Sequence, residues 1–482
     1  MTSSTHSNQT LPTSATIKQS RPKKMWHVLG LDPISKDFRH ELKLAKVGAY
    51  LHEHGHPLPA SDLERILRKC RWIVEDAILF SNEYIKASDG ILVDVSKNVQ
   101  FKGPKNSLGT SCYIDSLLFA MFGTYSCYDS LLGRRELASD AALHLQTTCR
   151  LYVNLLRTGK HISKTVIEMI RTDLAACGWK GGVSEEFGGT WENRPTQEDA
   201  SELLLFLMDI FELPFLPLGV KLHHDYDRDD DDARIITERI FQLSIPNEDD
   251  GPSESTCPIL LENVLVNYFY NNKVTGIRRN DQKLGREETI DAWSVMELLP
   301  FYSPENELGT NLLAHTTDFP EHNIIVPLTL KRYAMDCNCS SIRINQQVII
   351  PPLIDFSSFV GLQPGAPAAK YTLVLKSAVC HLGNSLSAGH YISYSVSPDD
   401  PTVWYKHDDL EFGNRRIRKY PTNKCFDDMA ENGYLFLYQL VCIPLPFIPD
   451  QAAPDYSRHQ TPPPQYDDRR KKGKESSGCF LQ

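Results

Sequence analysis

The chain has 482 residues, of which 41% are hydrophobic and 23% are charged, and its formal net charge at pH 7 is -10. This balance predicts a globular protein with one large core or two, and the acidic charge excludes a general nucleic-acid binder. No segment is apolar over the length of a membrane span, and twelve irregularly spaced cysteines without a signal peptide indicate a reducing, cytoplasmic compartment.

The N-terminal quarter of the chain divides into two parts. Residues 1–25 are rich in Ser, Thr, Gln and Asn without an apolar period, which predicts a disordered tail. Residues 26–95 show helical spacing, with apolar positions from Leu42 to Leu51 on one face and Ser61 as the cap of a second helix. This helical extension packs on the next domain or binds a partner, and packing is the favoured interpretation.

A turn rich in Gly, Thr and Ser then delivers Cys112 to the start of a helix. Ile114, Leu117 and Leu118 follow at helical spacing, which predicts one buried face. At a helix N-terminus, unpaired backbone N–H groups and the positive end of the dipole favour a thiolate and can hold an oxyanion. The alternative for Cys112 is an inert buried cysteine.

Further helices are predicted near residues 141–157 and 164–176, and a third contains Gln197. Asp199 and Glu202 are three residues apart, so the same helix face carries both. The acidic run 225–232 lacks the glycine and terminal glutamate of a calcium-binding hand and is interpreted as a solvated loop before a strand over 240–245.

Three predicted strands near the C-terminal end carry the groups that a nucleophilic cysteine needs. They cover residues 371–375, 390–396 and 403–405. His390 and Asp408 then lie on adjacent strands, close enough for a hydrogen bond. A cysteine nucleophile requires a base, and the base requires an orienting carboxylate.

The last segment, residues 446–482, is rich in proline and polar residues and is predicted to be disordered. Pro463, Pro464 and Tyr466 form the Pro-Pro-x-Tyr pattern that WW domains bind. Cys479 begins a Cys-a-a-X pattern that ends in Gln and follows a polybasic run. A farnesyl chain together with basic residues anchors a protein to an anionic membrane, so the sequence predicts prenylation and membrane association.

The order of these motifs resembles the ubiquitin-specific proteases, which are papain-like deubiquitinases built from fingers, palm and thumb. The cysteine box is matched by residues 109–116, and the histidine box by residues 371–409. Between and after the boxes, residues 195–204, 327–333 and 433–438 resemble the family's glutamine-containing helix, its Leu-Lys-Arg-Phe strand and its closing strand. The Ser-Cys-Tyr-x-Asp-Ser form is especially similar to the cylindromatosis-type branch.

The resemblance implies roles for individual residues. Cys112, His390 and Asp408 would form the catalytic triad, and Asp409 would be the second acidic residue, which helps to orient water or the oxyanion donors. Asp199 and Glu202 would bind the basic tail of ubiquitin. The family's oxyanion asparagine corresponds to Ser107 in this chain, so either Asn106, shifted by one residue, or Ser107 with backbone N–H groups takes that role.

The resemblance also implies an α+β fold with a helical thumb, a β-sheet palm and reduced fingers, formed by a hairpin over residues 271–288. The catalytic domain would cover residues 96–445. The family's zinc ribbon is missing, because Cys337 and Cys339 lack structural-zinc spacing, so neither a metal nor a cofactor is expected.

The sequence therefore predicts a deubiquitinase that hydrolyses isopeptide bonds at the C-terminus of ubiquitin and is tethered to a membrane. The alternative is a catalytically weak or inactive ubiquitin-binding adaptor that recruits partners at membranes. A papain-type protease for ordinary peptides is disfavoured by the order of the motifs and the lack of a secretory signal.

Overall fold

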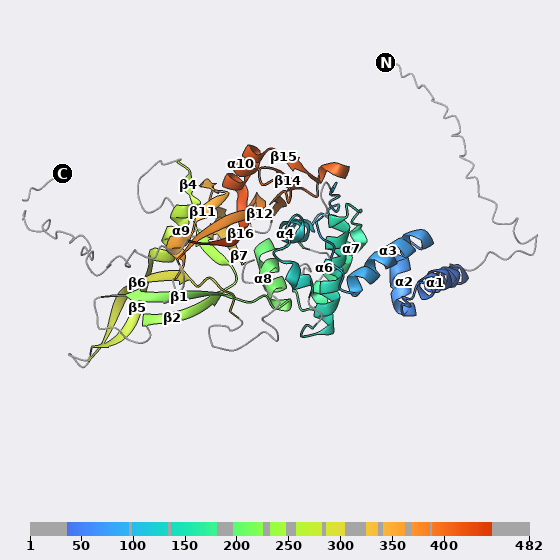
Figure 1. The fold of residues 1–482 in the computed structure, drawn as a ribbon, viewed down its shortest axis with the longest axis horizontal. Helices are drawn as coiled ribbons and strands as arrows, with labels where there is room; N and C mark the ends of the chain where they lie inside the picture. The colour runs from blue at the N-terminus through green and yellow to red at the C-terminus, as the bar shows by residue number, and fades with distance from the viewer. Residues whose placement is uncertain are drawn as a thin grey trace, which may run out of the picture.

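The computed structural model has a helical extension at one end, a small sheet at the other, and a large sheet with covering helices between them (Figure 1). It describes residues 36–95, 99–133, 136–180, 196–224, 232–246, 257–281, 286–303, 324–335, 341–361, 368–385 and 388–445. This architecture is the predicted α+β fold of thumb, palm and fingers. Among the helices in these residues, none is both long and apolar enough to cross a membrane.

The extension consists of α1 (Lys36–Glu53), α2 (Ala60–Lys69) and α3 (Val74–Ser88). Its own small core includes Val47 and Leu51, whereas Leu42 is half exposed. The cap of α2 is Pro59 rather than the predicted Ser61. Two polar contacts join α3 to the thumb: Arg150 donates to the carbonyl of Ala87, and Lys160 pairs with Glu83 at 2.8 Å. The extension therefore packs on the thumb.

The described residues of the thumb form the helices α4 (Cys112–Phe122), α5 (Asp129–Gly133), α6 (Asp140–Arg157), α7 (Lys164–Ala176) and α8 (Ala200–Ile210). The predicted helices over 141–157 and 164–176 correspond to α6 and α7. The third begins at Ala200, so Gln197 precedes the helix instead of lying within it, because the Asp199 carboxylate caps the first turn by accepting from Ser201 N and Glu202 N.

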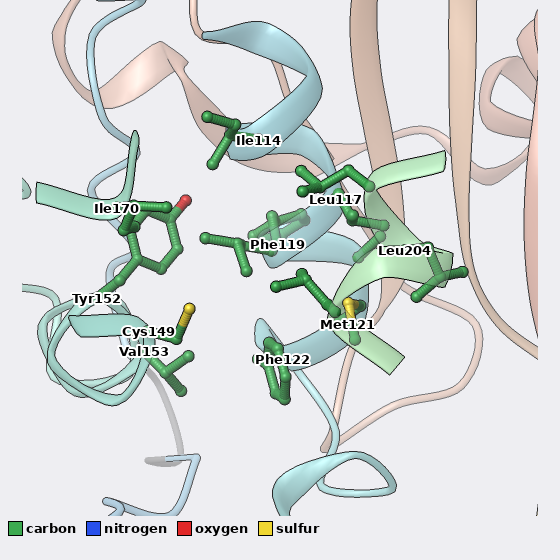
Figure 2. Packing of buried hydrophobic residues seen from close by; sticks show 14 of the residues in the cluster. Ile114, Leu117, Phe119, Met121, Phe122, Cys149, Tyr152, Val153, Ile170 and Leu204 are labelled. Carbon is green, nitrogen blue, oxygen red and sulfur yellow. The ribbon is translucent and has the colours of Figure 1, made fainter. Parts of the chain in front are cut away.

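Helix α4 is the centre of the thumb core. All of its residues are buried, although the sequence predicted one buried face. The difference arises because α4 lies between the main sheet and the other thumb helices. Figure 2 shows its Ile114, Leu117, Phe119, Met121 and Phe122 among Cys149, Tyr152 and Val153 of α6, Ile170 of α7 and Leu204 of α8. Burial of the many apolar side chains of α4 stabilises this arrangement.

The palm is an eight-stranded sheet in the order β15-β14-β13-β12-β16-β7-β3, with β11 also paired to β12. Its strands are β3 (Phe241–Ser244), β7 (Ile325–Lys331), β11 (Leu353–Asp355), β12 (Ala369–Ser385), β13 (Ala388–Val396), β14 (Trp404–His407), β15 (Ile417–Tyr420) and β16 (Gly433–Pro444). All pairs are antiparallel except β3 with β7. The predicted strands of the histidine box correspond to β12, β13 and β14, which are consecutive neighbours.

The fingers are a four-stranded antiparallel sheet in the order β2-β1-β6-β5. Its strands are β1 (Leu216–His223), β2 (Ala233–Glu238), β5 (Asn272–Asp281) and β6 (Arg286–Leu298). The predicted hairpin over 271–288 is too short, because β6 continues to Leu298 where it pairs with β1 as well as β5. Helix α9 (Leu261–Tyr270) leads into this sheet.

The remaining elements connect these parts. They are β4 (Ile259–Leu260), β8 (Tyr333–Met335), β9 (Ser341–Arg343), β10 (Val348–Ile349), η5 (Ser357–Phe359), η6 (Gly413–Arg415) and α10 (Thr422–Asn432). Arg332 is buried between β7 and β8 and donates to three backbone carbonyls, at Gly433 (2.6 Å), Gln346 (2.9 Å) and Ala430 (2.9 Å). These bonds hold the last turn of α10 and the start of β16 against the palm.

Candidate active site

Cys112 is the first residue of α4, directly after the cap residue Ser111, and its side chain is buried. One turn later, the Ser116 hydroxyl donates to the carbonyl of Tyr391 at 2.9 Å. Tyr391 follows His390 on β13, so this bond ties the helix of the cysteine to the strand of the histidine. The structure thus joins the helix that begins with Cys112 to the strand that carries His390, two elements far apart in the sequence.

The thiol of Cys112 donates to Oε1 of Gln197 at 3.4 Å. Burial raises the pKa of Cys112 to about 12, and the nearby Asp409 and Asp115 carboxyl groups add to the rise. A backbone N–H of Tyr391 acts in the opposite direction but does not compensate. Burial and the two carboxyl groups therefore oppose the predicted thiolate, and their effect on the pKa of Cys112 exceeds that of the Tyr391 backbone N–H.

His390 and Asp408 form the second half of the constellation. Nε2 of His390 lies 2.9 Å from Oδ1 of Asp408, which directly follows β14. Burial alone would raise the pKa of Asp408, but the hydrogen bond and charge of His390 outweigh it and hold the pKa below its usual value. An ionised Asp408 orients the imidazole through Nε2.

The two candidates for the oxyanion site differ in their contacts. Asn106 accepts from the backbone N–H of Ser111 through Oδ1 at 3.2 Å and donates from Nδ2 to Oδ1 of Asp409 at 3.3 Å. The Ser111 contact fixes which end of the amide is the oxygen. Within the described residues, the Ser107 hydroxyl has no hydrogen-bond partner. The geometry therefore places Asn106 between the start of α4 and the second acidic residue.

The two acids assigned to substrate binding lie in different settings. Asp199 caps α8, and its Oδ2 also accepts from the Tyr434 hydroxyl at 2.6 Å, so this carboxylate has structural partners on both oxygens. Glu202 is exposed on the first turn of α8. Burial and the neighbouring Asp199 and Glu198 raise the pKa of Glu202. Glu202 is the more exposed of the two residues.

Several sequence predictions lie outside the described residues, namely those on Cys337, Cys339, Pro463, Pro464, Tyr466 and Cys479. Within the described residues, one group of possible metal-binding side chains has its atoms close together, formed by His390, Asp408 and Asp409. Hydrogen bonds to one another and to Asn106 already occupy this group, so we assign no metal to it.

Comparison with known families assigns the chain to a class of enzyme. A family model described as "Ubiquitin carboxyl-terminal hydrolase" matches residues 103–438, which is more than two thirds of the chain. The chain belongs to the ubiquitin carboxyl-terminal hydrolase family. Membership makes it a cysteine-type ubiquitin hydrolase and confirms the predicted family. The comparisons do not separate the cylindromatosis-type branch from other members.

Solved structures similar to this hydrolase come from the SAGA DUB module. One of them is described as the yeast module. A chain of that yeast structure has 14% identity and a TM-score of 0.48, and covers 77% of this chain and 75% of its own. A chain of the Ubp8/Sgf11/Sus1/Sgf73 module bound to ubiquitin aldehyde has 14% identity and a TM-score of 0.49, and the match covers 77% of this chain and 76% of that chain. No curated protein matches the sequence.

Sequence reasoning missed three residues that shape this site. Gln197 was placed within a helix but contacts the thiol from the segment before it. Asp115, noted only as a variant of the cysteine box, is buried beside Asp409. Gly389 lies where β12 and β13 approach closely, and its position directly before His390 in the sequence is a local signal for it.

We predict that Gly389→Ala disables the hydrolase. A Cβ atom there would lie 2.4 Å from Nε2 of His381 and 2.8 Å from the carbonyl of Leu382. The His381 ring cannot easily move away from this Cβ, because its Nδ1 contacts the Tyr333 hydroxyl at 2.6 Å and the ring stacks on Tyr391. The strand must shift together with His390, and kcat/KM for ubiquitin-tail cleavage should fall about 100-fold.

Gly219→Ala is the matched control, because the nearest atom to a Cβ at this strand glycine is 3.9 Å away. It should retain kcat/KM within about twofold, which is the ordinary effect of a tolerated substitution. Circular dichroism checks that both variants fold. A folded Gly389→Ala enzyme with wild-type kcat/KM would contradict the role assigned to this close approach.

Proposed function

We propose that this chain cleaves the isopeptide bond between the C-terminus of ubiquitin and a lysine side chain. The observation that carries the proposal is the joining of the Cys112 helix to the His390 strand, with Asp408 hydrogen-bonded to the imidazole. The family match supports ubiquitin as the partner. These groups supply the nucleophile, the general base and its orienting carboxylate.

Because burial holds Cys112 as a thiol, the proton must leave during the attack. His390 would accept it through Nδ1 while the sulfur bonds to the terminal carbonyl carbon of ubiquitin. The tetrahedral oxyanion would accept from the backbone N–H of Cys112 and from the second N–H of Asn106. Protonation by His390 releases the lysine amine and leaves a thioester, which water hydrolyses to free ubiquitin.

The proposal predicts a covalent adduct with ubiquitin that carries an electrophile at its C-terminus. Wild-type protein should form the adduct, and Cys112→Ala should form none while it still binds unmodified ubiquitin. Intact-protein mass spectrometry measures the adduct, and calorimetry measures binding. Cys149→Ala serves as the control, because this buried thiol lies in the thumb core and should be dispensable for adduct formation.

The same experiment separates the enzyme from the adaptor alternative. Binding of ubiquitin without any adduct in wild-type protein would favour a catalytically inactive adaptor. Labelling that persists in Cys112→Ala would contradict the assignment of the nucleophile. Absence of both labelling and binding would remove ubiquitin as the partner.

We further propose that Glu202, beside the Asp199 cap, attracts the basic tail of ubiquitin. Glu202→Lys should slow adduct formation about tenfold at low ionic strength, and added salt should reduce this difference. Glu168→Lys is the control, since Glu168 is an exposed acid on α7 near Lys69 of the extension. Equal rates for the two variants would contradict the role of Glu202.

A membrane tether is the remaining part of the proposal, and the Cys479 motif with its upstream basic run supports it. Cys479→Ser should abolish farnesyl incorporation in cells and move the protein from the membrane fraction to the soluble fraction. Cys257→Ser, at an exposed thiol, should leave both unchanged. Membrane association that survives Cys479→Ser would contradict the tether. WW-domain binding through Pro463, Pro464 and Tyr466 stays a prediction from the sequence.

A further inference from the structure

Two carboxyl groups are buried side by side behind the candidate active site. Asp115 belongs to the first turn of α4, Asp409 follows Asp408 in the loop after β14, and their exposed fractions are 0% and 1%. The charge of Asp409 raises the pKa of Asp115, so the two carboxyl groups lie within electrostatic reach of each other. Two ionised carboxylates have only acceptors and repel, so a direct bond between them requires a proton.

The other contacts of the pair show where this proton lies. Oδ2 of Asp115 accepts from the Ser111 hydroxyl at 2.7 Å, and Oδ1 of Asp409 accepts from Nδ2 of Asn106 at 3.3 Å. Within the described residues, Oδ1 of Asp115 and Oδ2 of Asp409 are buried and receive no N–H or O–H donor. A hydrogen between these two oxygens satisfies both.

The ionisable groups around the pair come from several elements: Cys112 on α4, Tyr152 on α6, Arg171 on α7, His390 on β13, and Asp408 after β14. Nε2 of His390 lies 3.9 Å from Asp409 but bonds to Asp408. Arg171 donates to the Thr110 hydroxyl. The Tyr152 hydroxyl approaches the main-chain oxygen of Asp115 at 3.5 Å.

Burial and the mutual repulsion of the pair therefore dominate the local electrostatics. Burial raises the pKa of Asp409 to about 6 despite the opposing charge of His390. Burial and Asp409 together raise the pKa of Asp115 well above its usual value. Both shifts favour retention of one proton by the pair at neutral pH.

We propose that Asp115 and Asp409 hold one proton between them, and that this acid pair positions the Asn106 amide beside the start of α4. Asp115 is thus a positioning residue that acts through Asp409. The shared proton keeps Oδ1 of Asp409 as the acceptor for one N–H of Asn106, which leaves the second N–H for the oxyanion. The positioning part rests on the proposed function, whereas the shared proton does not.

The pair makes the stability of the fold depend on pH in a defined direction. In the unfolded chain both aspartates release their protons near pH 4, whereas the folded protein keeps one. The proton that only the folded protein keeps contributes to the free energy of unfolding. This contribution is fully present at acidic pH and is lost as the pH rises towards the upper pKa of the pair. Over that range the unfolding equilibrium constant of wild-type protein rises by up to tenfold per pH unit from this source.

Asp115→Asn tests the proton, because the amide has the shape of the acid and donates an N–H that does not titrate. The ratio of wild-type to variant unfolding constants, measured by urea denaturation, should rise between pH 5.5 and 8.5 by at least about tenfold. Asp409→Asn should show the same rise, since each substitution removes the same proton. Asp129→Asn is the control, because Arg157 rather than an acid faces that carboxylate, and its ratio should stay constant.

The positioning role is tested by the rate of labelling with the ubiquitin electrophile. The rate ratio of Asp115→Asn to wild type should increase at least about fivefold from pH 6.5 to 9.5, as wild type loses the shared proton and the Asn106 geometry. A rate ratio independent of pH would overturn the positioning role. Unfolding ratios independent of pH for both single variants would overturn the shared proton.

The unfolding experiment needs no ubiquitin, so it separates this inference from the proposed function. If wild-type protein is not labelled at any pH, the proposed function fails, and the positioning role fails with it. The shared proton is then tested by the pH dependence of the unfolding ratios alone.

Discussion

The hydrogen bond from Ser116 to the carbonyl of Tyr391 is the contact on which the site depends. It joins a helix that is buried on all sides to a central strand of the palm, so neither element can slide without breaking a buried polar bond. Cys112 lies one turn before Ser116, and His390 lies one residue before Tyr391. The relative position of nucleophile and base is thus set by the packing of α4 between the sheet and the thumb helices.

The same packing determines the chemical state of the nucleophile. Complete burial of α4 removes Cys112 from water, which raises the pKa of its thiol, and the thiol donates to Gln197. A protonated, buried thiol reacts slowly with small electrophiles, because the thiolate is the reactive form. Reaction then requires a group that takes the proton in place; in the proposed mechanism this group is His390, which is hydrogen-bonded to an ionised Asp408. Because Cys112 is buried, its reactivity depends on the correct alignment of His390.

Local patterns in the sequence were sufficient where a residue's position follows from its own element. The turn before Cys112 predicted the start of α4, and the alternating pattern predicted the neighbouring strands β13, which carries His390, and β14, which ends directly before Asp408. Local patterns failed where contacts with a distant segment determine the burial or position of a residue. The full burial of α4 depends on α6, α7, α8 and the sheet, and the capping of α8 by Asp199 leaves Gln197 free to reach Cys112. The contact that distinguishes Asn106 from Ser107 is made by Asp409, 303 positions after Asn106.

Buried polar groups at this junction connect elements that apolar packing alone would not align. An apolar contact tolerates small sliding movements, because its free energy depends on buried area and hardly on direction. Asn106, Ser111, Asp115 and Asp409 form a chain of directional bonds from the cysteine turn to the loop after β14. Each member is buried, so a displaced arrangement leaves at least one donor or acceptor unpaired, which costs about 1–3 kcal/mol. The network therefore favours the single arrangement in which the Asn106 amide is aligned with both the start of α4 and Asp409.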